Sequence, residues 1–286
     1  DIIHVHTPAT MGIMGMAFAK YYHLPLIGTF HTLLPEFAQY VSLPYAENLT
    51  KKALWKYSSI FYSKCKMTIA PTGYIKSLLK RHGVKNVVVV PTGIKLKRNK
   101  KNRASLRKKY GFAKNDKIIL HVGRISKEKN MQFIIKSLKK MLRKSIKLVI
   151  ASDGPYRKNL EKLAGKNKNI IFTGFLSERQ LDDYYLLADV FVAASKSETQ
   201  GLTVLEAAAR GLPIVAHDSP VISEFIKESK SGYIAKGDFA KRVSIILNNK
   251  RMARKFRNNA TNAIKRYSHQ RCVNELIKVY QSLLHQ

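Results

Sequence analysis

Short runs rich in β-branched residues alternate with segments of helical periodicity along most of this chain. Segments such as Met131–Lys144 repeat apolar residues every three or four positions, with lysines between them, as an amphipathic helix does. This alternation is typical of βαβ units and predicts an α/β fold with parallel sheets covered by helices. The predicted strands are Ile2–Val5, Leu26–Thr29, Met67–Ala70, Val87–Val90, Ile118–Val122, Leu148–Ala151, Ile170–Thr173, Val190–Ala193 and Ile214–Ala216.

The apolar pattern lapses at residues 95–109, where nine of fifteen positions are basic. This segment predicts an exposed linker that leads into a short helix, and it separates a domain at 1–94 from a domain at 110–267. Five strands follow it, enough for a complete doubly wound domain. Only four precede it, so we expect the first domain to be truncated. Residues 268–286 predict a final helix that packs back on the first domain.

The chain carries 52 Lys and Arg residues against 18 Asp and Glu, a formal net charge of +34. Such an excess attracts polyanions, and the candidates are nucleic acid, an anionic membrane face and an anionic small substrate. Composition does not choose among them. Cys65 and Cys272 lie far apart and outside any CxxC spacing, which fits a reducing cytoplasm and offers no metal site.

The segment SETQGLTVLE, residues 197–206, follows a predicted strand and leads through Gly201 into a helix at about Leu202–Arg210. The amide groups and the positive dipole end of that helix favour a diphosphate. Glu198 lies just before the helix, and Glu206 lies about 7 to 8 Å along its axis. Two carboxylates at this spacing, taken alone, fit a capped surface helix better than a sugar-nucleotide site.

A second loop adds cations to this pattern. His121–Arg124 closes a strand, and Lys129 precedes the helix that begins at Met131. The departure of a nucleoside diphosphate leaves negative charge that cations, a metal or amide dipoles must stabilise. Arg124 and Lys129 can do this together, although each basic residue taken separately is more simply a solvated surface group.

These motifs resemble the retaining glycosyltransferases of the GT-B fold, family 4. The resemblance rests on several motifs in the right order: DIIHVHTP at 1–8, PLIGTFHT at 25–32, VVPTGI at 89–94, VGRISKEKN at 122–130, ASDGP at 151–155, FTGFLS at 172–177, and the paired glutamates of SETQGLTVLEAAARGLPIVA. It implies two Rossmann-like domains that face each other across a cleft. It also implies that a glycine-rich loop of the first domain is missing from this chain.

The resemblance implies roles for particular residues. Glu198 matches a glutamate that contacts donor-sugar hydroxyls, and Glu206 one that binds the ribose. Arg124 and Lys129 match the cations on the donor diphosphate, and His31 matches a histidine that faces the reacting sugar. The other implied donor-binding residues are Gly123 in the cationic loop, Gln200, Gly201 and Leu202 at the phosphate, and Gly174, Phe175 and Leu176 at the base.

The resemblance implies a UDP-sugar as the donor substrate, and we expect no cofactor and no metal. It has no D-x-D triplet, and the adjacent Asp182 and Asp183 fall inside a helical pattern. This argues against the metal-dependent fold of glycosyltransferases. His4 and His6 share one strand face, but no third metal ligand is evident.

Two sequence motifs indicate the acceptor, because they match one group of enzymes within the family. SETQGLT and TFHTLLPEFAQYV resemble the 1,2-diacylglycerol 3-glucosyltransferases, which implies transfer of a hexose, glucose, to a lipid such as diacylglycerol. These enzymes are cytoplasmic and peripheral on the inner face of anionic membranes. Residues 33–66 combine eight apolar and aromatic side chains with lysines, a composition that suits a headgroup layer: Leu33, Leu34, Phe37, Tyr40, Trp55, Tyr57, Phe61 and Tyr62.

Other interpretations stay open from sequence alone. The aromatic residues of 33–66 can instead pack in the core, with the lysines merely solvated. The acceptor can be a soluble saccharide. A protein of another class, which binds nucleic acid on a degenerate transferase scaffold, also fits the charge. Against it, the basic residues are spread over many helices and are not gathered at a recognisable nucleic-acid-binding motif.

Overall fold

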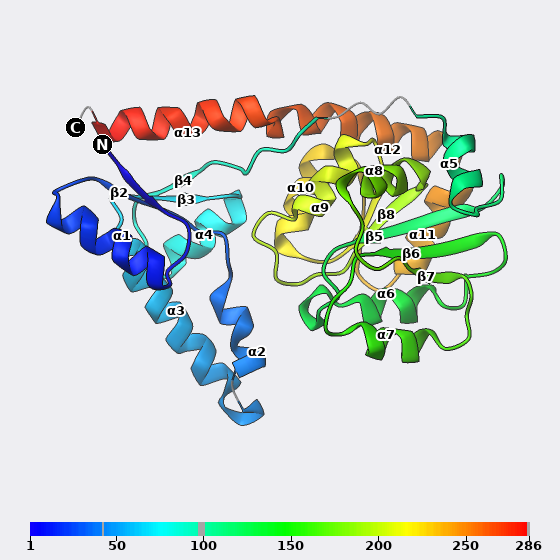
Figure 1. Cartoon of the computed structure of the whole chain (residues 1–286), viewed down its shortest axis with the longest axis horizontal. Coiled ribbons are helices and arrows are strands. Elements are labelled where there is room, and N and C mark those ends of the chain that lie inside the picture. The colour runs from blue at the N-terminus through cyan, green and yellow to red at the C-terminus, as the bar shows by residue number, and fades with distance from the viewer. Residues whose placement is uncertain (42, 97–100, 285–286) are drawn as a thin grey trace. The chain divides into compact units, whose positions relative to one another are not determined.

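The computed structural model describes residues 1–41, 43–96 and 101–284, and the chain divides into two compact units (Figure 1). The first unit comprises residues 1–93, 197–200 and 267–286, and the second comprises residues 94–196 and 201–266. Each is a Rossmann-like α/β unit built on one parallel sheet. The sequence placed Ser197–Gln200 in the second domain, whereas these residues belong to the first unit.

The sheet of the first unit has four parallel strands in the order β1-β2-β3-β4. These strands are β1 (Ile3–Val5), β2 (Leu26–Thr29), β3 (Met67–Ala70) and β4 (Val87–Val89). Its helices are α1 (Thr10–Tyr21), η1 (Leu34–Phe37), α2 (Ala38–Val41), η2 (Pro44–Ala46), α3 (Glu47–Ser63), α4 (Gly73–Arg81) and α13 (His269–Leu284).

The helix α13 joins the first unit through its apolar side. Val279 and Leu283 are buried against Ile27 and Ile69 of the sheet. Burial of each such aliphatic side chain stabilises the unit by roughly 1.5–3 kcal/mol. The last helix of the chain is therefore part of the core formed by its first strands.

The sheet of the second unit has six parallel strands in the order β10-β9-β8-β5-β6-β7. They are β5 (Lys117–Val122), β6 (Ile146–Ala151), β7 (Ile170–Phe172), β8 (Val190–Ala193), β9 (Ile214–His217) and β10 (Gly232–Ala235). The strand order reverses between β5 and β8, which pair directly. In an open parallel sheet, ligands bind outside the carboxyl ends of the strands at such a switch point.

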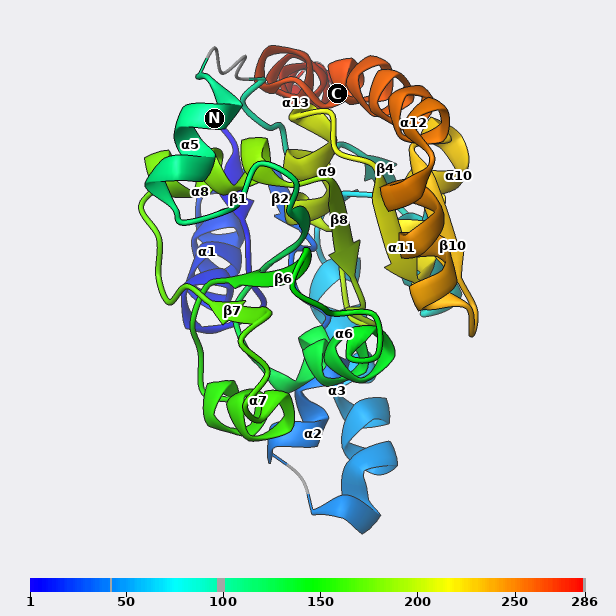
Figure 2. The same ribbon diagram turned by 90° about the vertical axis from the view of Figure 1, so that its right-hand side faces the viewer.

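Helices cover both faces of this sheet (Figure 2). On one face α6 (Met131–Leu138), α7 (Arg157–Ala164) and α11 (Phe239–Asn248) pack against inward residues such as Ile119 and Val190. On the other face α8 (Glu178–Leu187) and α9 (Leu202–Ala209) contact β5 and β8. The remaining helices are α5 (Arg103–Lys109), η3 (Lys127–Lys129), α10 (Pro220–Ser229), α12 (Lys250–Ala263) and η4 (Ile264–Tyr267).

All nine predicted strands are confirmed within a few residues of their expected ends, but two predictions need correction. The five strands expected in the second domain are six, because β10 is an edge strand that begins at Gly232 and shows no alternating pattern. The helix expected at Met131–Lys144 ends at Leu138, where the Met141 amide donates back to the Leu138 carbonyl and closes a tight turn.

Residues 97–100 of the predicted linker lie outside the described residues, and α5 is the short helix expected after them. Within the described ranges, no helix has the length and apolar character needed to cross a bilayer.

Candidate functional site

The predicted cationic loop of the second unit leaves the carboxyl end of β5, beside the switch point. Gly123 has a φ of +152°, which a side chain rarely allows. Arg124 follows and is exposed, and Lys129 is half-buried in η3. The turn is fixed by the Ser126 hydroxyl, which donates to Glu128 over 2.6 Å. Both cations therefore lie on a short loop that hydrogen bonds hold in place, at the carboxyl edge of the second sheet.

The start of α9 lies beyond the carboxyl end of the neighbouring strand β8. Gly201 is the N-cap, with a φ of +73° in the left-handed region, so its backbone turns into the helix without a Cβ. The Ser195 and Ser219 hydroxyl oxygens are buried near this edge and have no hydrogen-bond partner among the described residues. Buried polar atoms without partners are rare, and at a site they indicate a ligand or water that completes them.

Glu206 lies in the second turn of α9, and α8 fixes its carboxylate. The Tyr185 hydroxyl donates to Glu206 Oε2 over 2.9 Å. Tyr185 is only 1% exposed, and burial together with the Glu206 charge raises the pKa of its hydroxyl well above the usual range. Arg210 covers the Tyr185 ring at 4.6 Å and pairs with Asp182. These contacts hold the Glu206 side chain in one orientation.

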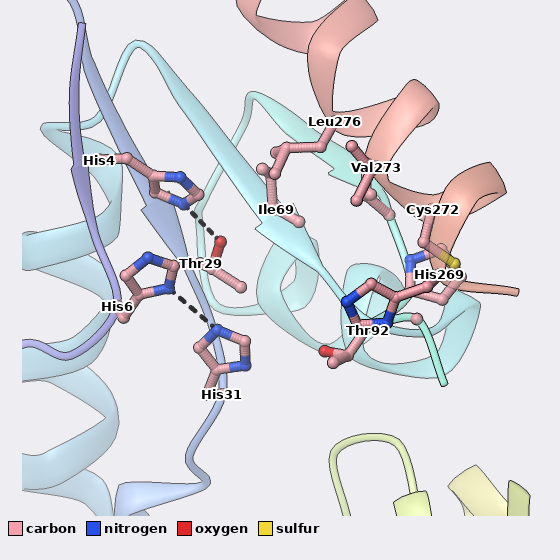
Figure 3. Close-up of a pocket in the computed structure, with 13 residues that line it drawn as sticks. His4, His6, Thr29, His31, Ile69, Thr92, His269, Cys272, Val273 and Leu276 are labelled. Carbon is pink, nitrogen blue, oxygen red and sulfur yellow. Dashed lines mark hydrogen bonds between the residues drawn. The ribbon is translucent and has the colours of Figure 1, made fainter. Parts of the chain in front are cut away.

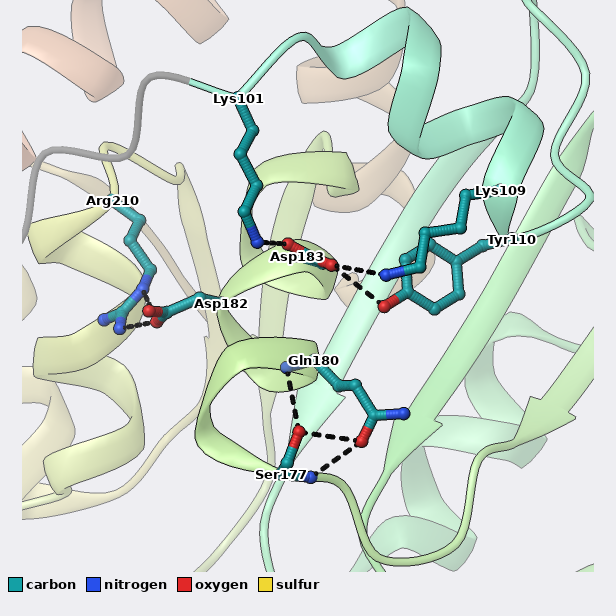
Figure 4. Close-up of polar contacts among 8 residues, drawn as sticks. All are labelled: Lys101, Lys109, Tyr110, Ser177, Gln180, Asp182, Asp183 and Arg210. Atoms are coloured by element: carbon teal, nitrogen blue, oxygen red, sulfur yellow. Dashed lines mark hydrogen bonds and ion pairs between the residues drawn. The ribbon is translucent and has the colours of Figure 1, made fainter.

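Asp182 and Asp183 lie within α8, as predicted, and both are engaged in ion pairs (Figure 4). Asp182 pairs with Arg210. Asp183 is fully buried and contacts Lys101, with Lys109 at 3.2 Å. Burial opposes its ionisation, but the hydrogen bonds from Lys101, Tyr110 and Lys109 together outweigh burial and keep the pKa of Asp183 below its usual range. The two aspartates fasten helices to one another within this unit.

The predicted base-binding segment follows β7. Gly174 has a φ of +72°, and Phe175 is 82% exposed. Ser177 and Gln180 form a capping box that starts α8 immediately afterwards (Figure 4). Phe175 therefore offers an uncovered aromatic face on a loop whose end is firmly anchored.

A row of histidines lies at the carboxyl edge of the first sheet (Figure 3). His6 follows β1 and His31 follows β2, and the His6 Nδ1 and His31 Nε2 atoms are 3.1 Å apart. The His4 and His6 ring centroids are 4.3 Å apart. His4 is held from both sides, with Tyr280 and Thr29 hydroxyl oxygens each 2.7 Å from a ring nitrogen.

This packing favours the neutral form of His4 and His31. Burial, and then the neighbouring His6 and His31, lower the pKa of His4 to about 4. One side of the His31 ring opens to solvent, but desolvation of the other side and the proximity of His6 lower its pKa as well. Near neutral pH, His31 therefore offers a neutral ring, which can donate one hydrogen bond and accept another.

Residues 197–200 are fastened to the same edge of the first sheet. The Thr199 hydroxyl donates to the His31 carbonyl over 3.0 Å, and Thr72 donates to the Thr199 carbonyl over 3.2 Å. The Gln200 amide group makes two bonds with the Thr92 backbone, at 2.8 and 2.9 Å. Glu198 is half-buried within this fastened segment. The structure thus brings His31, Glu198 and Gln200 to one edge of the first unit.

A pocket of about 230 Å³ opens at this edge, with the three histidines on one wall and α13 on the other (Figure 3). Its lining is mostly apolar. Gly93 permits the close approach of α13, because an added Cβ would lie 2.7 Å from His269 Cα. The pocket is lined by His4, His6, Thr29, His31, Ile69, Val90, Pro91, Thr92, Gly93, His269, Cys272, Val273 and Leu276.

Sequence reasoning missed Tyr185, His269 and Gly93. Tyr185 gave no signal beyond an aromatic residue in a helical pattern. His269 gave none either, whereas Gly93 stood inside the quoted motif VVPTGI. Among the described residues, no group of three or more His, Cys, Asp or Glu side chains is arranged to hold a metal ion.

Two sequence profiles of known families match this chain. The profile described as Glycosyl transferases group 1 matches residues 102–263, and the profile described as Glycosyltransferase Family 4 matches residues 1–98. Together they match nearly the whole chain up to the end of α12.

Similar curated proteins include two named alpha-monoglucosyldiacylglycerol synthase. The one from Streptococcus pneumoniae is 34% identical over 251 residues, which cover 83% of this chain and 56% of that protein. The one from Acholeplasma laidlawii is 33% identical over 248 residues, which cover 81% of this chain and 62% of that protein. The chain thus spans about three fifths of the length of these relatives.

Solved structures show the same fold at low identity. Alr3699/HepE of Anabaena in complex with UDP-glucose has a TM-score of 0.82 and 17% identity, with coverage of 98% of this chain and 79% of that chain. Sucrose-phosphate synthase of Thermosynechococcus elongatus has a TM-score of 0.84 and 18% identity, with coverage of 99% and 74%.

Proposed function

Because this chain belongs to the family of glycosyl transferases group 1, we propose that it transfers glucose from UDP-glucose to a hydroxyl of a diacylglycerol-type lipid. The observation that carries the donor side is the switch point of the second sheet. There the loop of Arg124 and the left-handed Gly201 follow adjacent strands, close to buried serine hydroxyls that lack partners among the described residues. The lipid acceptor rests on the likeness to two monoglucosyldiacylglycerol synthases.

In this proposal the second unit holds the nucleoside diphosphate. The amides at the start of α9, with Arg124 and Lys129, stabilise the charge that develops on the leaving diphosphate. Glu206, held by Tyr185, accepts hydrogen bonds from the ribose hydroxyls. The loop of Gly174, Phe175 and Leu176 covers the base. The cations and amides suffice for the leaving group, so the reaction needs no metal and no cofactor.

The first unit supplies the groups for the sugar and the acceptor. Glu198 accepts hydrogen bonds from sugar hydroxyls, and neutral His31 faces the reacting sugar. The acceptor hydroxyl forms a bond to the anomeric carbon as the bond to the diphosphate breaks, and the configuration is retained. The proton of the hydroxyl leaves with the diphosphate. The mostly apolar pocket beside His31 suits the start of the acyl chains of a lipid better than a polar sugar.

The segment from η1 to α3 suits a membrane surface. Five of its exposed apolar side chains, which we call the aromatic surface, are Phe37, Tyr40, Leu43, Tyr45 and Leu49. Lys52 and Lys56 of α3 are exposed as well. Aromatic and basic side chains together favour the headgroup layer of an anionic membrane. We therefore infer a cytoplasmic enzyme that is peripheral on the inner face of the membrane.

The test is product analysis with the full-length protein. It would be offered UDP-, GDP- and ADP-sugars together with diacylglycerol, a glucosylated lipid or soluble saccharides, in vesicles that contain anionic lipid. Mass spectrometry should show one added hexose on the lipid from UDP-glucose, and proton NMR should show an α-anomeric linkage. Turnover should persist after treatment with EDTA. Transfer to a saccharide but to no lipid would overturn the acceptor assignment, and loss of turnover in EDTA would overturn the metal-free mechanism.

The nucleic-acid alternative draws no support from the comparisons, because both family profiles describe glycosyltransferases. A soluble acceptor remains the alternative within the enzyme class, and the acceptor panel separates it from the lipid.

A further inference from the structure

A second pocket lies at the opposite edge of the second sheet, where β5 and β8 begin. It has a volume of about 340 Å³, and five basic side chains line it: Arg103, Lys117, Lys250, Arg254 and Arg257. We call it the cationic pocket. An adjoining cavity of about 500 Å³ shares Arg103 and Lys117 with it and adds Arg107 and Lys114. Neither cavity contains a residue that the proposed function assigns to the donor or the acceptor.

The single carboxylate in the cationic pocket, that of Asp189, already accepts hydrogen bonds from other groups. Asp189 Oδ1 accepts from Arg103 over 2.7 Å. Its Oδ2 accepts from the Ile118 amide over 2.9 Å and lies 3.7 Å from Arg107 Nη2. Asp189 thus joins α5 to the sheet. Its charge also acts on Arg257 of α12, but from beyond ion-pair distance.

The helix α12 brings charge of one sign to this pocket. It carries five Lys and Arg residues and no Asp or Glu in its fourteen residues. In the part of the chain that the structure describes, no ion pair involves Lys250, Arg254 or Arg257. Exposed Lys250 and Arg254 can be solvated by water. Arg257 is half-buried, and its guanidinium group has less access to solvent.

Two arginines distinguish the cationic pocket from an ordinary basic surface that is solvated by water. The Arg103 Nε atom is buried and has no hydrogen-bond partner in the described ranges. Burial, and then the charge of Arg103, lower the pKa of Arg257. Like charges held close together repel each other, and more strongly where one of them is desolvated, as Arg257 is. An anion in this pocket would offset that repulsion and could accept a hydrogen bond from the Arg103 Nε atom.

We propose that the cationic pocket binds a phosphate group, carried by a small soluble anion or by the headgroup of an anionic phospholipid. Arginine favours phosphate because its planar fork donates two parallel hydrogen bonds to phosphate oxygens. The pocket presents the forks of Arg254 and Arg257. Arg103 adds its Nε atom, because its Nη2 atom already donates to Asp189 and to backbone carbonyls. The volume has room for a phosphate with part of its substituent. This site goes beyond the proposed transfer reaction and lies at the other edge of the same sheet.

The first test is a titration of the full-length protein with inorganic phosphate, in a buffer without phosphate or sulfate, followed by calorimetry. The variant Arg257→Gln should weaken phosphate binding by about tenfold or more, because it removes a charged hydrogen-bond donor. The control Arg251→Gln changes the same helix and the same net charge, but Arg251 does not line the pocket and should keep phosphate affinity within about twofold. Arg254→Gln serves where Arg257→Gln fails to fold, because Arg254 is exposed.

The second arm identifies the source of the phosphate group. Sedimentation with phosphatidylglycerol vesicles, compared with phosphatidylcholine vesicles, would be measured for the same variants. Loss of phosphatidylglycerol binding in Arg257→Gln or Arg254→Gln, but not in Arg251→Gln, without measurable binding of inorganic phosphate would identify a lipid headgroup. Equal binding of both probes by the pocket variants and the control would overturn the proposal, as would no binding of either probe. Because binding is read without turnover, this outcome is independent of the proposed reaction.

Discussion

At the scale of single residues, one hydroxyl controls the orientation of Glu206. Tyr185→Phe removes the 2.9 Å bond to Glu206 and keeps the buried ring beneath Arg210. A hydrogen bond to a charged group contributes about 1.5–3 kcal/mol, so affinity for UDP-glucose should fall by about tenfold or more. Calorimetry would measure it. The neighbouring Tyr184→Phe is the matched control, and an unchanged affinity in Tyr185→Phe would remove Glu206 from the donor site.

Arg124 should affect turnover more than binding. Its charge is required as the diphosphate leaves, so Arg124→Ala should lower kcat by about 100-fold or more, with a smaller change in the KM for the donor. Steady-state kinetics would measure both constants. Lys127→Ala, on the same loop and exposed, is the control and should keep kcat. If Arg124→Ala raised only the KM, the residue would bind the ground state alone.

His4 should remain neutral well below the usual range for histidine. Its pKa of about 4 means that the unfolded chain binds the proton more tightly than the fold between about pH 4 and 6.5. Stability contributed by His4 is therefore present above pH 6.5 and is lost as the pH falls towards 4. NMR titration of the His4 ring should show no protonation at pH 5.5, and a normal midpoint near 6.5 would contradict the packing described above. His4→Asn should flatten the decline of stability with acid.

At the scale of elements, the aromatic surface was only partly predictable. Phe37 and Tyr40 are exposed as the membrane interpretation expected, but Phe61 and Tyr62 are buried in the core. Trp55 stacks on His82 with ring centroids 3.9 Å apart. A helix with aromatic residues on several sides gives no sign in its sequence of which side meets the sheet, because that depends on partners distant in sequence.

The aromatic surface should govern binding to vesicles. The double variant Tyr45→Ser with Leu49→Ser removes two side chains that are 85% and 73% exposed, so the fold should tolerate it. Each apolar side chain buried in the interface contributes roughly 1 kcal/mol or more, and binding to anionic vesicles should fall by about tenfold. Vesicle sedimentation would measure it. The exposed Ile277→Ser, on α13, is the control, and equal binding by both variants would place the membrane contact elsewhere.

The sequence predicted the strands better than it predicted which unit the loop at Ser197–Gln200 belongs to. Continuous β-branched runs such as Ile118–Val122 identify buried parallel strands, and glycines at 123 and 201 mark the connections that follow. The membership of Ser197–Gln200 in the first unit was not predictable. It depends on hydrogen bonds from Thr199 to His31 and from Gln200 to Thr92, and these pairs are 168 and 108 positions apart in sequence. Tyr185 escaped prediction for the same reason.

At the scale of the whole molecule, the net charge of +34 should act on association rather than on folding or donor chemistry. The charges are spread over both units, and only a small share are assigned to the donor or to the cationic pocket. A field of this kind raises the local concentration of protein at any anionic surface. Its reach is set by the Debye length, which is about 10 Å at 0.1 M salt and about 3 Å at 1 M.

Salt should therefore separate the two contributions to membrane binding. Between about 0.05 and 0.5 M NaCl, binding to phosphatidylglycerol vesicles should fall by at least about tenfold, because each basic residue at the surface contributes about 1 kcal/mol that screening removes. We expect only weak binding to neutral vesicles, carried by the aromatic surface, and this binding should change little with salt. Affinity for UDP-glucose should fall less, because its cations act at contact distance within a site. If vesicle binding did not change with salt concentration, apolar contacts would dominate it. The large excess of basic residues would then serve binding to a different anionic partner.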